Sequence, residues 1–299
     1  QSVLGKFPVS GIQPRKEGAL MKTAIFGAGQ GGAMASRWIP GEVVCFMDNN
    51  PACQNTESDH IPVLSLEAGL KLSPDLILIA VLNQEAAESI RKQIEASGYH
   101  GSIETISSFR KLQDLRLAEL RLAAEQIRDR NVPGDTAELG VYQGAFAREI
   151  NRCFPDRKLY LLDTFEGFAE ADLKHETGGT YRNDFSDTSI ELVRQKLPHP
   201  EQAVFVKGHF PESAPGLPET SYAFVSLDPD LSAGAEAGLE YFWPRLSKGG
   251  VIVLHDYTSL QYPGVREAAD RFCRKHGLYL IPLADLHGSA VFLKQGGEP

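Results

Sequence analysis

The sequence predicts an α/β chain with two doubly wound sheets, one in each half of its 299 residues. Continuous apolar runs of strand length alternate with helical stretches, which is typical of buried parallel strands joined by crossover helices. Each half opens with a strand that runs into glycines. The last two apolar runs lie close together near the C-terminus, which predicts an antiparallel hairpin at the end of the second sheet.

Composition and charge narrow the kind of partner. An apolar content of 42% in 299 residues is enough to give each of two domains a core. The net charge of −9 and the pI near 5.4 argue against nucleic acid and against anionic membranes, because both require a basic face. We therefore expect a small-molecule partner.

The cysteines and the hydropathy pattern indicate in which cellular compartment the protein is found. The four cysteines lie far apart without a CxxC pair, so neither a zinc knuckle nor a disulfide framework is indicated. No apolar run approaches the roughly 18 residues of a membrane span, and residues 1–20 lack the apolar stretch of a signal peptide. These features favour a reducing cytoplasm, and we interpret residues 1–20 as a loose tail or an upstream extension.

Residues 21–104 are predicted to form the first domain. A strand at "KTAIF" leads through a glycine turn into a helix, and a second strand follows at "EVVCF". The run "DLILIAV" is a third strand, followed by a helical stretch at residues 85–96. This order of elements predicts a small parallel α/β unit.

The glycine turn of this domain has the form G-x-G-x-x-G, with Gly27, Gly29 and Gly32 at the glycine positions. Asp48 ends the next strand 19 residues beyond Gly29. This spacing predicts a Rossmann-like domain that binds a nucleotide or NAD, with helix-start amides on the diphosphate and the acid on a ribose hydroxyl. The same turn also suits a helix that merely packs closely on its strand.

Two further observations bear on the ligand of this domain. The pieces "FMDNNP" and "IPVLSLEAGLKLSPDLILIAV" resemble small N-terminal domains of bacterial sugar-modifying enzymes, some of which bind a nucleotide-sugar. No tyrosine is followed by lysine four residues later, which counts against a short-chain dehydrogenase. An NAD(P)-dependent oxidoreductase built on this turn is kept as an alternative function.

Residues 105–130 are predicted as a helical connector. Apolar residues recur at three- and four-residue steps from Ile106 to Ile127, interleaved with charged residues, which indicates an amphipathic helix. A helix that packs on one domain alone would give the same pattern. The sequence "NVPGD" then breaks the helix and opens the second domain, residues 131–299.

Seven strands are predicted in the second domain. In chain order they are "TAELGV", "KLYLLD", "AVFVKG", "YAFVSLD", "GGVIVLHD", "LYLIPL" and "SAVFLK". Helical stretches lie between most of the first five, so we predict a doubly wound sheet.

The first strand of this domain runs into a second glycine turn, of the form E-x-G-x-x-x-G. Its defining positions are Glu138, Gly140 and Gly144, and the next strand ends at Asp163, 19 residues after Gly144. S-adenosylmethionine-dependent methyltransferases have a turn of this form. Its glycines let the backbone approach the methionine part of the cofactor, and the acid can accept both ribose hydroxyls.

From Asn131 to about Lys294 the sequence resembles the macrocin O-methyltransferase family, metal-dependent enzymes that methylate sugar hydroxyls of natural products. The resemblance rests on "VPGDTAELGVYQG", "LLDTFEGF", "FVKGHFPESAP", "VSLDPDL", "LSKGGVIVLHDY" and "YPGVREAADRF". It implies a seven-stranded class I methyltransferase fold, S-adenosylmethionine as cofactor, a sugar-containing substrate and a homo-oligomer.

The same resemblance implies a set of cofactor-binding residues. Those around the glycine turn and the following strand are Glu138, Gly140, Tyr142, Gly144 and Asp163. Gly208 and His209, after the third strand, would lie near the adenine.

Two strands predicted to be neighbours end in acids, Asp228 and Asp256, whose carboxylates would converge at the carboxyl edge of the sheet. A hard divalent cation such as Mg²⁺ would offset their repulsion and stabilise an attacking alkoxide. In the resembling family the metal is held by the first acid of a D-G-D-L motif and by an Asp-Asp pair. The matching residues here, Asp228, His255 and Asp256, are the candidate metal ligands.

His255 departs from the family pattern and allows several interpretations. His255 and Asp228 are the two candidates for the general base. Alternatively, His255 binds a softer ion such as Mn²⁺ or Zn²⁺, or its presence means that the site holds no metal. It could also be a core residue that only forms hydrogen bonds. Asp230 either supports the metal or caps the helix that starts near Ser232. A domain that binds nucleotide or cofactor without catalysis is the alternative to an enzyme.

Overall fold

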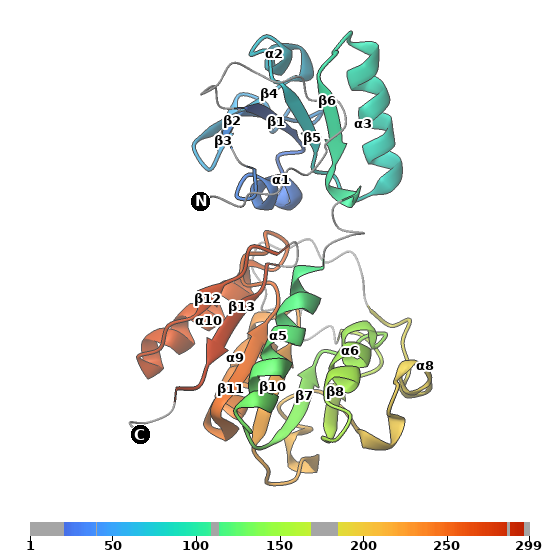
Figure 1. The fold of residues 1–299 in the computed structure, drawn as a ribbon, viewed down its shortest axis with the longest axis vertical. Helices are drawn as coiled ribbons and strands as arrows, with labels where there is room; N and C mark the ends of the chain where they lie inside the picture. The colour runs from blue at the N-terminus through green and yellow to red at the C-terminus, as the bar shows by residue number, and fades with distance from the viewer. Residues whose placement is uncertain (1–20, 40, 109–113, 169–184, 286–287, 296–299) are drawn as a thin grey trace. The chain divides into compact units, whose positions relative to one another are not determined.

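The computed structural model describes residues 21–39, 41–108, 114–168, 185–285 and 288–295 (Figure 1). The predicted tail, residues 1–20, lies outside this described part. The chain divides into two compact units, Gln1–Gln113 and Asp114–Pro299, and each is described by itself. Within the described residues, no helix combines the length and the apolarity needed to cross a membrane.

The first unit is built on a six-stranded sheet with the order β3-β4-β2-β1-β5-β6, in which only the β3–β4 pair is antiparallel. Its elements are β1 (Lys22–Phe26), α1 (Gln30–Ala35), β2 (Glu42–Met47), β3 (Thr56–Ser58), β4 (Ile61–Leu64), α2 (Leu66–Leu70), β5 (Leu76–Ile79), α3 (Gln84–Ala96) and β6 (Ser102–Thr105). The predicted strands at β1, β2 and β5 are confirmed. The prediction missed β3, β4 and β6: β3 and β6 are short and largely polar, and β4 contains a proline, whereas the equally short β5 is entirely apolar.

Both faces of this sheet are covered by helices. Phe26 and Met47 belong to a core that also contains Ile94 of α3. Their chain neighbours Ile25 and Phe46 are fully buried too, and they point to the opposite face because side chains alternate along a strand. Helix α1 lies on that face, since a Cβ on its Gly32 would come within 3.2 Å of the Phe46 ring, so the first unit is doubly wound.

The second unit is built on a seven-stranded sheet with the order β12-β13-β11-β10-β7-β8-β9. Its elements are α5 (Leu115–Asp129), β7 (Asp135–Leu139), α6 (Ala145–Cys153), β8 (Leu159–Asp163), α8 (Ile190–Lys196), β9 (Ala203–Lys207), β10 (Tyr222–Leu227), α9 (Ser232–Arg245), β11 (Leu246–Leu254), α10 (Pro263–His276), β12 (Ile281–Pro282) and β13 (Ala290–Leu293). The five strands from β7 to β11 are parallel, whereas β13 runs antiparallel to β11 and β12. The predicted terminal hairpin is therefore confirmed, although β12 has only two residues.

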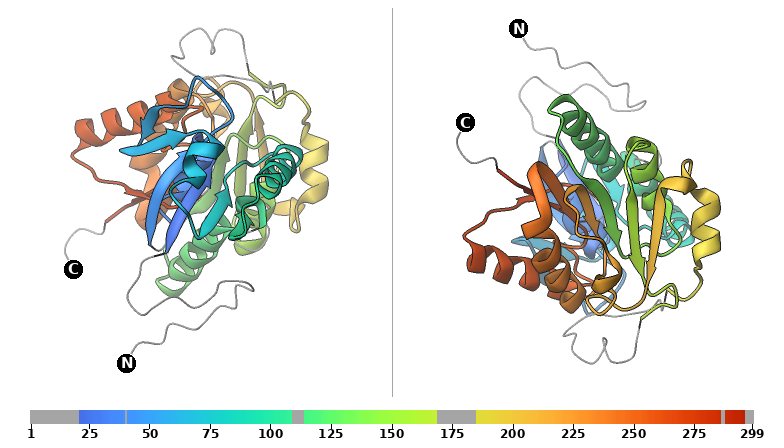
Figure 2. Two further views of the ribbon diagram at one scale, coloured as in Figure 1. Left: turned by 90° about the horizontal axis from the view of Figure 1, so that it is seen from above. Right: turned by 90° about the horizontal axis from the view of Figure 1, so that it is seen from below.

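Side chains of the second sheet alternate between two cores, one on each face. Leu159 and Leu161 of β8 pack with α5, α6 and α8. Tyr160 and Leu162 of the same strand belong to the core that contains α9 and α10. Figure 2 shows these two helix layers on opposite sides of the sheet, which is the doubly wound arrangement that the sequence predicted.

The segment predicted as a connector contributes its helix to the second unit. Helix α5 begins at Leu115, where Asp114 caps it by accepting a hydrogen bond from the Leu117 amide at 2.8 Å. Leu120 and Ile127 of this helix are fully buried in the core of the second sheet. The second unit thus begins at Asp114, and α5 belongs to it because this helix covers one face of its sheet.

The strand order reverses between β7 and β10. The chain leaves β7 toward β8 and β9, and it returns to β10 on the other side of β7. Open α/β sheets bind ligands outside the carboxyl ends of the strands at such a reversal. The glycine turn after β7 and the acid after β10 both lie at this point.

Candidate functional site

Three central strands of the second sheet end level with one another. Leu227 of β10 pairs with Leu139 of β7 on one side and with Leu254 of β11 on the other. The residues that follow these three leucines therefore lie at one edge of the sheet: Gly140, Asp228 and His255.

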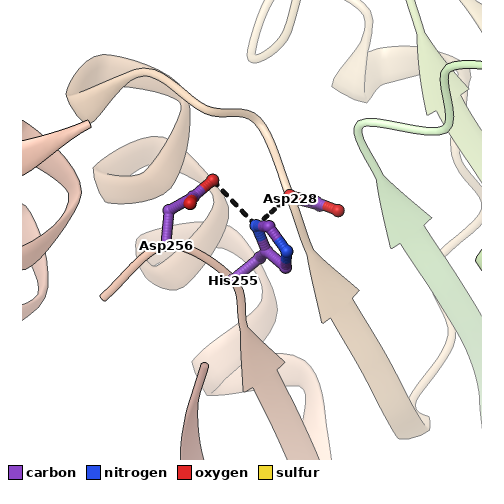
Figure 3. Close-up of side chains that lie close together, drawn as sticks. All are labelled: Asp228, His255 and Asp256. Atoms are coloured by element: carbon purple, nitrogen blue, oxygen red, sulfur yellow. Dashed lines mark hydrogen bonds and ion pairs between the residues drawn. The ribbon is translucent and has the colours of Figure 1, made fainter. Parts of the chain in front are cut away.

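Asp228, His255 and Asp256 lie together at this edge (Figure 3). Nδ1 of His255 is 2.8 Å from Oδ1 of Asp228 and 2.7 Å from Oδ2 of Asp256. One potential ligand atom of each residue lies within 4.8 Å of the other two. The predicted convergence of the two carboxylates is confirmed, and the imidazole ring lies between them.

The opposite charges of this cluster stabilise one another: the carboxylates favour the imidazolium of His255, and the imidazolium favours the ionised form of Asp228. Burial disfavours the imidazolium of His255, but the carboxylates of Asp228 and Asp256 outweigh burial and raise its pKa to about 10. Burial likewise disfavours the Asp228 carboxylate, yet His255 and Arg116 hold its pKa below the ordinary value. Without a bound cation, the Nδ1 proton of His255 therefore lies between two carboxylates at neutral pH.

Arg116 of α5 is a further charged group of this site, and we did not predict it from the sequence. Its Nη1 is 3.1 Å from Oδ2 of Asp228, and its Nη2 donates to Oγ of Ser226 at 3.2 Å. Its side chain is only 8% exposed. One sequence signal does point to it: Arg116 stands four residues before Leu120, on the apolar stripe of the helix, where a solvated charge is unusual.

Asp230 does not cap the helix that follows it. Helix α9 begins at Ser232 with Leu231 in the N-cap position, and no side chain caps it. Burial raises the pKa of the Asp230 carboxyl well above its ordinary value, and the charges of Asp228 and Asp256 raise it further. The helix-cap interpretation is therefore wrong, and Asp230 is a third acidic group at this edge.

The second glycine turn fits tightly between neighbouring segments. Gly140 has a φ of +85°, and a Cβ atom there would lie 2.0 Å from the backbone oxygen of Asp228. Gly144 has a φ of +75° at the N-cap of α6, and a Cβ there would lie 2.7 Å from the Val193 side chain. Both positions need glycine for conformation and for space.

Two acids predicted to contact the cofactor flank this turn. Glu138 is 1% exposed, and its Oε2 has no hydrogen-bond partner among the described residues; burial raises the pKa of this carboxyl well above its ordinary value. Asp163 accepts hydrogen bonds from the amides of Val141, Tyr142 and Phe165 at 2.7, 2.9 and 2.7 Å. Asp163 thus holds the glycine turn in place, and its contact with a ribose stays a prediction.

The residues predicted near the adenine lie on the loop after β9. The Gly208 amide donates to the backbone oxygen of Asp163 at 3.0 Å, which ties this loop to the end of β8. Nδ1 of His209 is 2.7 Å from Oε2 of Glu212, and the His209 side chain is 45% exposed. This loop reaches the carboxyl edge of the sheet, and its contact with an adenine stays a prediction.

Left-handed backbone conformations gather at the same edge. Among the described residues of the second unit, six residues other than glycine have positive φ, and four of them lie just after central strands: Tyr142 (47°), Phe165 (53°), Asp230 (58°) and Asp256 (60°). Each such conformation costs about 1–3 kcal/mol and persists only where the surrounding structure imposes it, commonly at functional sites. Their concentration here supports the assignment of the site.

The first glycine turn, in the other unit, shows close packing. A Cβ on Gly32 would lie 2.0 Å from the backbone oxygen of Gly27, whereas one on Gly29 would meet nothing within 4 Å. The Ala28 amide donates to Oδ2 of Asp48 at 3.0 Å, so the acid predicted to hold a ribose contacts the turn itself. Nucleotide or NAD binding by Gly27, Gly29, Gly32 and Asp48 stays a prediction.

The strand order of the second sheet, the glycine turn after its first strand and the acids at its carboxyl edge define a class I methyltransferase domain. A family model described as Macrocin-O-methyltransferase (TylF) matches residues 73–295. The chain belongs to this family. The match begins upstream of residue 131, where the resemblance read from the sequence began.

Relatives of known activity agree with this membership. The chain is 29% identical over 192 residues to an 8-demethyl-8-(2,3-dimethoxy-alpha-L-rhamnosyl)-tetracenomycin-C 4'-O-methyltransferase of Streptomyces olivaceus, covering 59% of this chain and 72% of the relative. It is 30% identical over 179 residues to a Mycinamicin III 3''-O-methyltransferase of Micromonospora griseorubida, covering 54% and 69%. The solved structure of the O-methyltransferase NovP matches with a TM-score of 0.53 and 26% identity, over 60% of this chain and 80% of that one. The chain is an S-adenosylmethionine-dependent O-methyltransferase.

Proposed function

We propose that this enzyme methylates a hydroxyl group of a sugar or of a related polyhydroxylated small molecule. The relative from Streptomyces olivaceus is named for a rhamnosyl-bearing tetracenomycin, which supports a sugar-containing acceptor here. The observation that carries the proposal is the cluster of Asp228, His255 and Asp256 beside the glycine turn at Gly140. This arrangement brings groups that handle protons and cations next to the turn expected to hold the methyl donor.

The second glycine turn fits the cofactor. The buried Oε2 of Glu138, which has no hydrogen-bond partner among the described residues, can accept a hydrogen bond from the amino group of a methionine moiety. The residues that would hold the cofactor are Glu138, Gly140, Tyr142, Gly144, Asp163, Gly208 and His209. S-adenosylmethionine supplies an electrophilic methyl group when it is bound there.

The donor set at the carboxyl edge fits a divalent cation. Asp228 and Asp256 offer carboxylate oxygens, and His255 offers an imidazole nitrogen. Mg²⁺ prefers oxygen ligands, whereas Mn²⁺ and Zn²⁺ accept nitrogen. We therefore propose that the site prefers these softer ions. A bound cation would supply positive charge that stabilises the deprotonated acceptor hydroxyl.

Methyl transfer also releases the proton of the acceptor hydroxyl. Without a cation, His255 has a raised pKa of about 10, so at neutral pH its imidazole already carries a proton, whereas Asp228 is ionised. A cation bound through the imidazole nitrogen would take the place of that proton, so in neither state is this nitrogen free to accept the proton of the acceptor hydroxyl. We therefore assign the base role to Oδ1 of Asp228. His255 contacts this oxygen through Nδ1 and holds it at the edge of the sheet.

Isothermal titration with S-adenosylhomocysteine tests the cofactor site. We expect binding to the wild-type chain and weaker binding to Asp163→Asn, because this carboxylate holds the glycine turn. Asp48→Asn is the matched control: it removes the corresponding acid of the other glycine turn and should leave the affinity unchanged. Absence of binding both with and without Mn²⁺ would refute the proposed function. Methyl transfer to a panel of glycosides then identifies the acceptor.

A further inference from the structure

Arg116 links helix α5 to the end of strand β10 by a forked contact. Its two terminal nitrogens reach Asp228 and Ser226, at 3.1 and 3.2 Å. Ser226 lies in β10 and Asp228 directly follows the strand; the two residues are two positions apart along extended chain, so their side chains point to the same side. The guanidinium carbon lies 3.9 Å from the centre of the Phe146 ring of α6. The guanidinium is thus held in one orientation, by hydrogen-bond contacts at its edge and by the Phe146 ring on its face.

The two oxygens of Asp228 have different partners. Oδ2 faces Arg116 at 3.1 Å, and Oδ1 faces Nδ1 of His255 at 2.8 Å. The terminal torsion of an aspartate is broad, so a carboxylate held at one oxygen alone can turn. Contacts at both oxygens define the plane of the carboxylate and direct Oδ1 to the His255 side.

Stability alone does not account for this buried ion pair. Apolar side chains of similar volume commonly replace a buried ion pair without loss of stability, because both charges must be stripped of water.

We propose that Arg116 is the positioning residue of Asp228. It holds Oδ2, so that Oδ1 faces His255 and the reacting hydroxyl. The charge of Arg116 also acts on Glu138 and on His255, and Arg116→Lys keeps this charge while it removes the fork. The inference rests on the proposed function for its catalytic consequence, whereas the orientation of Asp228 is testable without any methyl transfer.

The imidazole of His255 reports the orientation of Asp228 directly. We would record histidine side-chain NMR spectra of the full chain carrying Arg116→Lys, Asp228→Asn or both, and assign the His255 signal by its loss in His255→Gln. A lysine offers one point contact instead of a planar fork, so Arg116→Lys should shift the His255 signal. No further shift is expected in the Asp228→Asn background. An unchanged signal, or an equal shift in both backgrounds, overturns the inference.

The kinetic readout is a double-mutant cycle. Arg116→Lys should lower kcat by on the order of 10- to 100-fold, since a misplacement of about 1 Å costs up to that much, and should leave the KM for S-adenosylmethionine nearly unchanged. Added to Asp228→Asn, it should cause no further loss. Arg128→Lys is the matched control, because Arg128 lies on the same helix and, within the part of the chain that the structure describes, donates to the backbone oxygen of Cys153.

Two outcomes separate this inference from the proposed function. A wild-type chain that methylates no glycoside refutes the proposed function, while the His255 signal still decides whether Arg116 orients Asp228. If Arg116→Lys fails to fold, Ser226→Ala removes the second acceptor of the fork and should shift the same signal. Full kcat and an unchanged His255 signal in Ser226→Ala would then overturn the inference.

Discussion

Replacing Gly140 by alanine tests whether this glycine is needed because strand β10 ends so close to it. The added Cβ would lie 2.0 Å from the backbone oxygen of Asp228, at a φ of +85°. The left-handed conformation costs an alanine about 1–2 kcal/mol, and overpacking costs typically 1–3 kcal/mol. We expect the free energy of unfolding to fall by about 2–5 kcal/mol.

The same substitution should affect activity through Asp228. The backbone at Asp228 must move by about 1 Å to bring the contact to 3.0 Å, below which Cβ atoms are essentially never found. A displacement of this size at a catalytic group costs up to about 100-fold in rate. We therefore expect kcat to fall by roughly 10- to 100-fold in the folded variant.

Gly277→Ala separates the cost of conformation from the cost of the close contact. Gly277 ends helix α10 with a φ of +63°, and a Cβ there would meet nothing within 4 Å. The free energy of unfolding of Gly277→Ala should fall by about 1–2 kcal/mol, and the variant should keep full activity. Urea unfolding and steady-state kinetics of both variants provide the comparison. Equal destabilisation of the two, or full activity of Gly140→Ala, would refute the reasoning.

Three further predictions concern the acidic edge. Asp228→Asn should lower kcat by about 10²- to 10⁴-fold, to a residual rate that is still measurable, while S-adenosylhomocysteine still binds in calorimetry; full turnover would show that neither base nor metal depends on this residue. His255→Asp, which supplies the second carboxylate of the family pattern, should shift the metal preference from Mn²⁺ toward Mg²⁺, and an unchanged order of activation by the two ions would contradict a nitrogen ligand. The raised pKa of His255 predicts a pH dependence of stability without metal. A folded-state pKa of about 10 against an ordinary value of 6.5 means that the imidazolium stabilises the fold fully below pH 6.5, and that this stabilisation, up to about 5 kcal/mol, is lost between pH 6.5 and 10. Urea unfolding of the wild type and His255→Gln in EDTA across this range measures it, and parallel curves would rule it out.

Much of the second unit was predictable because its signals are local. Continuous apolar runs mark strands that are buried on both faces, and five of the seven became the parallel strands β7 to β11. Glycine turns are visible because each needs a backbone that other residues adopt only with strain, as Gly140 and Gly144 show. The meeting of Asp228 and Asp256 also followed from the sequence, since neighbouring parallel strands end at one edge.

The parts that were missed depend on contacts between distant segments. Arg116 is 112 residues from Asp228 in the chain, and only the packing of α5 on the second sheet brings them together. From the sequence, Asp230 fits either a group that supports the metal or a helix cap, because Asp before a helix commonly caps it. The structure rejects only the cap, since Leu231 holds the N-cap position and Asp230 has a positive φ beside the other acids.

By itself, then, the sequence determined the fold class, the two glycine turns and the acids at the strand ends, because periodicity and strand direction are properties of local segments. Only the tertiary structure decided which partner each charged group has. Ion pairs such as Arg116 with Asp228 depend on the packing of helices on the sheet, and nothing in the residues around either charge specifies the other.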